Sequence, residues 1–134
     1  MPDANKALAH QFFERLNAGD LTLVDDLVSD DFVEHEELPG LEPTKAGLRK
    51  LFEGFHAAFG DGKFEVDDMI AEGDKVSVRA RMTGTHRAEF MGIPATGRTI
   101  NVGVADYLRF DGGKVVEHWG VMDTGAMMQQ LTGD

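Results

Sequence analysis

The sequence predicts an α+β domain in which helices pack on one face of an antiparallel sheet. Two observations indicate this class. Apolar residues recur with a helical period of about 3.6 as far as Gly60 and with the strand period of 2 afterwards. In addition, no repeat, low-complexity segment or interdomain linker interrupts the 134 residues. Helices followed by strands are typical of the α+β class, and we expect a single domain over residues 1–134.

Three helices are expected before Gly60 and a fourth near the end of the sequence. In the first helix Leu8, Phe12 and Leu16 recur every four residues, which gives the helix one buried face. The third helix has the same kind of apolar face, and Gly60 ends it. The expected ranges are 22–28, 44–59 and 124–131 for the later helices, and 30–35 for a short extended segment.

Four strands are expected after Gly60, each bounded by a turn that contains Gly or Asp. Their ranges are 64–71, 75–83, 99–110 and 114–123. In the third of them, strict alternation puts Asp106 on the same face as Val104 and Leu108. Burying an unpaired carboxylate costs several kcal/mol, so Asp106 is expected to have a partner or to be protonated.

The hairpin RFDGGK sets the register of the last two strands. A three-residue loop with Gly113 in the left-handed conformation, followed by a bulge, places Asp106 opposite His118. A two-residue Asp-Gly loop would place Asp106 opposite Glu117, where two carboxylates repel. We prefer the first register, which predicts an Asp106–His118 pair suited to general acid–base chemistry. An equal alternative is a structural pair that only holds the hairpin in register.

Composition excludes several classes of function. The net charge of −11 argues against nucleic acid and against anionic membranes, because such binding depends on clustered Lys and Arg. The absence of cysteine excludes disulfides and thiolate chemistry. Neither a signal-peptide pattern nor a membrane-length apolar run is visible, so a cytoplasmic protein is expected. A metal site of Glu34, His35, Asp106 and His118 is chemically conceivable, but no spaced ligand motif supports it and none is expected.

Several segments together resemble a known family. They are GTHRAEFMGIPATGR, YLRFDGGKVVEHWGVMD and the terminal MMQQLTGD, together with LNAGD and DDFVEHE nearer the start. These segments are similar to the SnoaL-like polyketide cyclases and related ester cyclases of the nuclear transport factor 2-like superfamily. The resemblance covers nearly the whole chain. It implies a cone-shaped barrel, in which a curved antiparallel sheet wraps around three N-terminal helices and an apolar cavity, and it implies a homodimer through the sheet.

The resemblance also implies a kind of chemistry. In the characterised cyclases a cavity carboxylate deprotonates carbon next to a carbonyl, and an intramolecular aldol condensation closes a ring without metal or cofactor. Their acid–base aspartate falls on Gly120 of this sequence, and their partner histidine falls on Asp106. The histidine of VEHW is matched by His118. Either Asp106 has taken over the role of the base with His118 as its partner, or cyclase activity is lost.

Our leading hypothesis is a cofactor-independent enzyme, of the cyclase or isomerase kind, acting on a small apolar molecule that carries a carbonyl group. Asp106 would be the acid/base, and His118 would orient it or relay the proton. The residues expected to bind the ligand are Phe12, Leu16, Phe52, Phe55, Val104 and Leu108 around the cavity, Glu34 and His35 near its mouth, and Gly120. The alternatives are a non-catalytic protein that binds a hydrophobic small molecule, a dimerisation module, and a hydrolase or hydratase on the same fold.

Overall fold

The computed structural model describes residues 2–133, so Met1 and Asp134 of the expected domain range lie outside the described residues. The helices are α1 (Pro2–Asn17), α2 (Leu23–Leu27), α3 (Lys45–Ala58) and α4 (Thr124–Thr132). The strands are β1 (Val28–Glu34), β2 (Lys63–Glu72), β3 (Lys75–Thr85), β4 (Thr99–Asp111) and β5 (Lys114–Met122). Every expected element is present within a few residues of its expected range, and the expected extended segment overlaps β1. None of the described helices is long and apolar enough to cross a membrane.

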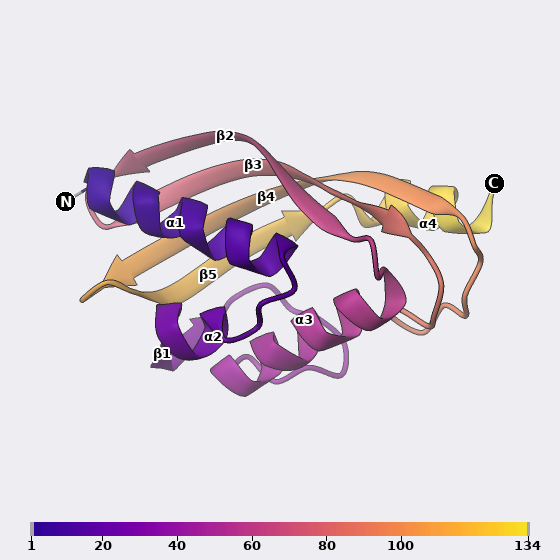
Figure 1. Cartoon of the computed structure of the whole chain (residues 1–134), viewed down its shortest axis with the longest axis horizontal. Helices are drawn as coiled ribbons and strands as arrows, with labels where there is room; N and C mark the ends of the chain where they lie inside the picture. The colour runs from indigo at the N-terminus through magenta and orange to yellow at the C-terminus, as the bar shows by residue number, and fades with distance from the viewer. Residues whose placement is uncertain (1, 134) are drawn as a thin grey trace.

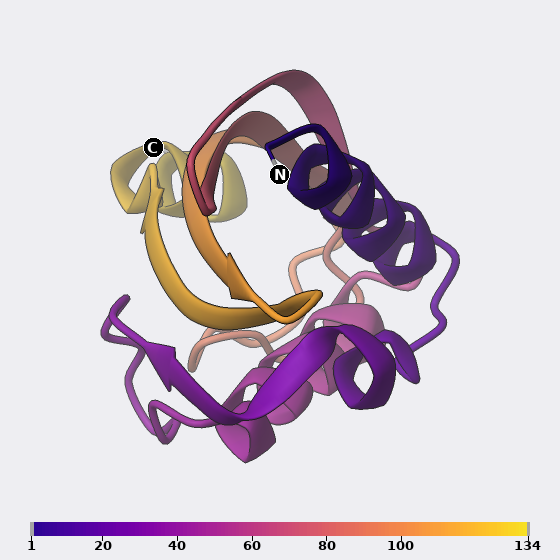
Figure 2. The same ribbon diagram turned by 90° about the vertical axis from the view of Figure 1, so that its left-hand side faces the viewer.

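The five strands form one sheet in the order β1-β5-β4-β3-β2 (Figure 1). Neighbours among β2 to β5 are antiparallel, and β1 joins the edge of the sheet parallel to β5. Seen along its strands, the sheet curls strongly, with α1 on one side of the opening and α4 outside the curve (Figure 2). The predicted fold class is therefore confirmed, and the parallel edge strand makes the sheet mixed rather than purely antiparallel.

The core lies inside the curve of the sheet, where α1 packs against β2 and β3, and α3 packs against β1. The amphipathic helix α3 buries Phe52 and Phe55 on its inner face. Thr44 begins this helix by accepting a hydrogen bond from the backbone N–H of Gly47 at 3.3 Å. The ring of Phe52 meets that of Phe12 on α1 edge to face, with 5.9 Å between the centroids. Aromatic packing therefore holds α1 and α3 together under the sheet.

The turn between β4 and β5 differs from its expected geometry. Gly112 and Gly113 form a two-residue loop between the paired residues Asp111 and Lys114. Both glycines have positive φ, +61° and +81°, which is the conformation that fits a two-residue hairpin to the twist of its strands. The three-residue loop expected from the sequence is therefore wrong, because the second glycine allows the tighter turn.

A bulge in β5 then shifts the register of the hairpin. Val116 is the extra residue. Phe110 pairs with Val115 on the turn side of the bulge, and Arg109 pairs with Glu117 on its other side. The bulge reverses the inward and outward alternation of the rest of β5, so His118 turns toward the inside of the sheet. Asp106 lies opposite Gly120, and Leu108 lies opposite His118. The predicted register, with Asp106 directly opposite His118, is wrong by two residues, and Asp106 and His118 are diagonal neighbours instead.

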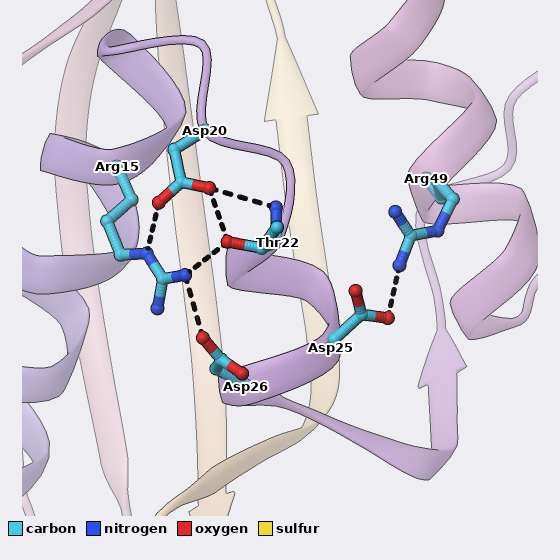
Figure 3. A network of polar contacts seen from close by, with 6 residues as sticks. All are labelled: Arg15, Asp20, Thr22, Asp25, Asp26 and Arg49. Carbon is cyan, nitrogen blue, oxygen red and sulfur yellow. Dashed lines mark hydrogen bonds and ion pairs between the residues drawn. The ribbon is translucent and has the colours of Figure 1, made fainter.

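An ion-pair network holds the short helix α2 between α1 and α3 (Figure 3). Arg15 of α1 donates from Nε to Oδ2 of Asp20 at 2.9 Å and from Nη2 to Oδ2 of Asp26 at 2.8 Å. Asp25, on the same short helix, pairs with Arg49 of α3. Exposed ion pairs contribute little to stability one by one. These ion pairs fix the orientation of α2, which leads directly into β1.

Asn17, the last residue of α1, fastens the helix to the first residues of β2. Its amide nitrogen donates to the carbonyl oxygen of Phe64 at 2.9 Å, and its Oδ1 accepts the N–H of Phe64 at 2.7 Å. The side chain thus imitates a neighbouring strand at this point. Each hydrogen bond of this kind contributes roughly 0.5–1.5 kcal/mol to stability.

We expect Asn17→Ala to lower the free energy of unfolding by roughly 1–3 kcal/mol, because two backbone groups of Phe64 lose their partner. Urea denaturation followed by circular dichroism measures this change. Gln11→Ala is the matched control, since Gln11 carries the same amide on the exposed face of α1. Equal stability of the two variants would contradict the role assigned to Asn17.

Candidate active site

His118 lies between two carboxylates inside the curve of the sheet. Its Nε2 is 2.7 Å from Oδ1 of Asp106 on β4, and its Nδ1 is 2.5 Å from Oε2 of Glu34 at the end of β1. The side chains of His118 and Asp106 are each 14% exposed and that of Glu34 is 8% exposed. Glu34 reaches the ring because the parallel pairing of β1 with β5 sets it opposite His118. The structure thus brings together three residues that the sequence singled out.

Gly120 leaves room for the diagonal contact between His118 and Asp106. A Cβ atom at Gly120 would lie 2.6 Å from Cε1 and 3.0 Å from Nε2 of His118, and it would overlap Oε1 of Glu36. Such contacts are too short for carbon, so any other residue here would displace the ring. Gly120 therefore acts by having no side chain, and the imidazole leans over it toward β4.

The surroundings of His118 decide its charge. Burial lowers the pKa of the imidazole, but the hydrogen bonds to Asp106 and Glu34, together with the negative charges of these two groups, outweigh burial and raise the pKa from 6.5 to about 10. The ring is thus an imidazolium at neutral pH, and both of its nitrogens donate. In this state His118 cannot accept a proton, so its effect is to hold and neutralise the two carboxylates.

An apolar cavity of about 70 Å³ opens beside this cluster. Its walls include Phe12, Leu16, Phe52, Phe55, Val104 and Leu108, which are the six apolar residues expected there. Further apolar side chains that the sequence did not single out also line it, among them Phe32, Phe64, Met82 and Phe90. Asp106, His118 and Glu34 form its polar end. Apolar walls with a few convergent polar groups are typical of a small-molecule site.

A wider groove of about 400 Å³ adjoins the cavity, between the β1–α3 loop and the start of α3. Both spaces share the side chains of Glu34, Glu36, Leu38, Leu48 and Leu51. A cavity of about 70 Å³ alone is smaller than the roughly 300 Å³ or more of usual ligand pockets. Together, the two spaces offer an inner end for a reacting group and an outer end for the rest of a ligand.

His35 does not lie at the mouth of the cavity, where the sequence analysis placed it. Its ring stacks on Trp119, with 4.6 Å between the centroids, and its Nε2 is 2.7 Å from Oε2 of Glu117. Hydrogen bonds from His35 and Arg109 lower the pKa of Glu117. Because neighbouring strand residues point to opposite faces, Glu34 faces inward and His35 faces outward. His35 therefore belongs to the outer surface of the sheet.

Glu34, Glu36 and His118 present ligand atoms within 4.8 Å of one another, a spacing that a cation could use. Both ring nitrogens of His118 are already held by carboxylates, however. A metal ion would have to displace Glu34 or Asp106 from the ring and remove its protons. The donor set therefore fits an imidazolium between carboxylates better than a metal ligand, and the chemistry below uses the side chains alone.

A curved sheet around helices, with an apolar cavity that ends in ionisable groups, places the protein in the nuclear transport factor 2-like class. Within that class, the profile of the SnoaL-like polyketide cyclases matches residues 7–131. The chain therefore belongs to the SnoaL-like polyketide cyclase family. A search of curated protein sequences finds no match.

Solved structures similar to this chain carry different descriptions. AclR of Streptomyces galilaeus, described as a candidate hydroxylase, is 34% identical with a TM-score of 0.87 over 100% of this chain and 99% of that one. IdmH of Streptomyces antibioticus, a candidate polyketide cyclase, is 31% identical with a TM-score of 0.82 over 96% and 98%. TsrD of Streptomyces laurentii is 27% identical with a TM-score of 0.87 over 96% and 95%. The similarity thus extends over whole chains.

Glu36 is the site residue that the sequence analysis missed. It lies in the acidic run EHEE, which reads as a solvated loop. The spacing of two residues between Glu34 and Glu36 could have revealed it, because a chain that stays extended brings every second residue to the same face. The backbone N–H of Glu36 donates to Oε2 of Glu34 at 3.1 Å, which keeps the two carboxyl groups close.

We expect Gly120→Ala to displace the ring of His118 and the carboxyl group of Glu36, because the added methyl group needs their space. The free energy of unfolding should fall by roughly 1–3 kcal/mol, as in other overpacked sites. Gly103→Ala on the neighbouring strand is the control, since a Cβ there meets no atom within 4 Å. Thermal or urea unfolding of both variants tests this, and a stable Gly120→Ala protein would contradict the packing described.

We expect the charge of His118 to make stability depend on alkaline pH. Because its pKa is raised in the folded protein, the stabilisation is complete below pH 6.5 and is lost as the pH rises through about 10. Between pH 7 and pH 10 the wild type should lose more stability than His118→Gln, in which other titrating groups are the same. Urea denaturation along this pH range measures the difference, and parallel curves would show that the imidazolium is not present.

Proposed function

We propose that the protein is a cofactor-independent acid–base enzyme that removes a proton from carbon next to a carbonyl group. The observation that carries this proposal is the carboxylate of Asp106 at the polar end of an apolar cavity. Oδ1 of Asp106 is held by Nε2 of His118, and Oδ2 has no hydrogen-bond partner among residues 2–133. The free oxygen is therefore available to a bound molecule. Membership of the SnoaL-like polyketide cyclases supports the same kind of chemistry.

The roles of the residues follow from their charges. Asp106 is the base, and His118 is a positioning residue that orients the carboxylate through a charge-assisted hydrogen bond. Glu34 binds the opposite nitrogen and fixes the plane of the ring. The cavity takes the apolar carbon next to the carbonyl group and places it beside the base. An aldol-type cyclisation or a double-bond isomerisation begins with this proton transfer.

The expected homodimer through the sheet stays a prediction. Tyr107 and Val121 are 42% and 71% exposed, and lie on strands at the centre and near the edge of the sheet. Tyr107 packs edge to face against Trp119, with 5.7 Å between the centroids. A second copy of the chain on this face would bury these side chains, which supports a homodimer through the sheet.

Hydroxylation is a second candidate, because AclR, described as a candidate hydroxylase, is 34% identical to this chain. Removal of a proton next to a carbonyl group gives an enolate. An aldol reaction of this enolate needs no further reagent, whereas its hydroxylation also needs dioxygen as the oxidant. A non-catalytic protein that binds a hydrophobic ligand would lack this step. An assay of the proton transfer itself therefore tests the proposal without knowledge of the natural substrate.

We expect the wild type to accelerate the exchange of the α-protons of 1-tetralone for deuterium in D₂O, followed by NMR. Asp106→Asn should lower the rate by roughly 100-fold or more, since it removes the base. Asp111→Asn, at the exposed end of β4 in the same hairpin, should exchange at the wild-type rate. Equal rates in the wild type and Asp106→Asn would sink the assignment of the base, and binding of 1-tetralone without any exchange would favour a non-catalytic binding protein.

A further inference from the structure

The carboxyl group of Glu36 lies over Gly120, at the boundary between the cavity and the groove. Its Oε1 occupies the place that a side chain at Gly120 would take. Its side chain forms no hydrogen bond or ion pair with any of residues 2–133, whereas Glu34 and Asp106 each hold a nitrogen of His118. Glu36 thus has free hydrogen-bonding capacity and faces the space that a ligand would occupy.

Asp106 and Glu36 both adjoin Gly120, whose backbone carries no side chain. Asp106 lies opposite Gly120 in the sheet, and Glu36 covers Gly120 from the β1–α3 loop. The loop is closed by the hydrogen bond from the N–H of Glu34 to the carbonyl oxygen of Pro43 at 3.1 Å, which holds Glu36 at this position. A flat carbonyl group bound in the cavity could therefore present its α-carbon to one carboxyl group and its oxygen to the other.

The two carboxyl groups have different electrostatic surroundings. Burial raises the pKa of Glu36; the positive charge of His118 opposes part of this rise, and the negative charges of Asp106 and Glu34 add to it. The groove contributes two more acidic side chains, Glu37 and Glu42, and no basic one. The negative charge of Asp106, in contrast, is neutralised directly by the imidazolium of His118. Paired carboxyl groups in such unequal surroundings are a recurrent arrangement of one acid with one base.

We infer that Glu36 is a second catalytic residue of this site, the general acid that gives its proton to the carbonyl oxygen of the substrate. This inference rests on the proposed function of Asp106. It also narrows the substrate to molecules whose carbonyl oxygen is reached from the groove side while the adjacent carbon lies against Asp106. Among residues 2–133, His118 is the one basic side chain that lines the groove or the apolar cavity, so the substrate is a neutral ketone or ester rather than a carboxylate.

The proposed step is balanced within the site. Asp106 removes the proton from the α-carbon, and the electron pair of the broken C–H bond forms the carbon–carbon double bond of the enol. The electron pair of the carbonyl double bond moves to oxygen, which takes the proton of Glu36. Asp106 is then protonated and Glu36 is ionised. The side chain of Asp106 is 14% exposed, so it exchanges this proton for one from the solvent. Return of a solvent-derived proton or deuteron from Asp106 to carbon, and of the hydroxyl proton to Glu36, restores both groups.

The test compares Glu36→Gln with Glu53→Gln, a matched change on the exposed face of α3. We expect Glu36→Gln to lower the deuterium exchange of 1-tetralone by roughly 10-fold or more and Glu53→Gln to leave it unchanged. In the wild type the rate should fall as the pH rises through the titration of Glu36, and this dependence on pH should be missing in Glu36→Gln. A ¹³C NMR titration of the glutamate carboxyl groups, assigned with the same variants, should give Glu36 a higher midpoint than Glu53. Circular dichroism checks that both variants fold.

A wild-type rate in Glu36→Gln, with Asp106→Asn inactive, overturns the role of Glu36 and leaves the proposed function in place. A lowered rate with a titration midpoint of Glu36 no higher than that of Glu53 also overturns it, because an ionised carboxylate cannot donate. Absence of exchange in the wild type overturns the proposed function and this role together.

Discussion

The sharing of His118 between Glu34 and Asp106 is the interaction on which the rest of the site depends. Three ionisable groups are largely buried here, and burying any one of them alone would cost several kcal/mol. Each is stable only because the others neutralise it. The three side chains come from β1, β4 and β5, so this cluster also ties the parallel edge strand to the antiparallel hairpin.

Two irregularities of β5 allow that cluster to form. The bulge at Val116 turns His118 inward; without it the alternation would place His118 outside, on the face where Trp119 now lies. The missing side chain at Gly120 then leaves room for the ring to reach Asp106. A regular strand with an ordinary residue at position 120 would satisfy the sheet equally well but would have no place for the imidazolium.

The same geometry explains how the site differs from the pattern expected of the family. The resemblance predicts that the aspartate of the characterised cyclases corresponds to Gly120. In the structure, carboxyl groups adjoin that position, with Asp106 opposite it and Glu36 over it. The carboxyl groups to which we assign acid–base roles therefore adjoin this position in space, although they come from other positions in the sequence. The positive charge of His118 and the burial of Glu36 give these carboxyl groups different surroundings, and the proposed roles of base and acid rest on this difference.

The sequence by itself determined the α+β class, the ranges of the elements, the apolar wall of the cavity and the contact between Asp106 and His118, because hydrophobic period and parity are local properties. Only the tertiary structure decided the rest. The register of the hairpin depends on the conformation of two glycines and one bulge, and Glu34 becomes a partner of His118 only when β1 pairs with β5. The position of Glu36 over Gly120 also depends on the tertiary structure, since the burial of a loop carboxyl group depends on what the rest of the chain packs around it.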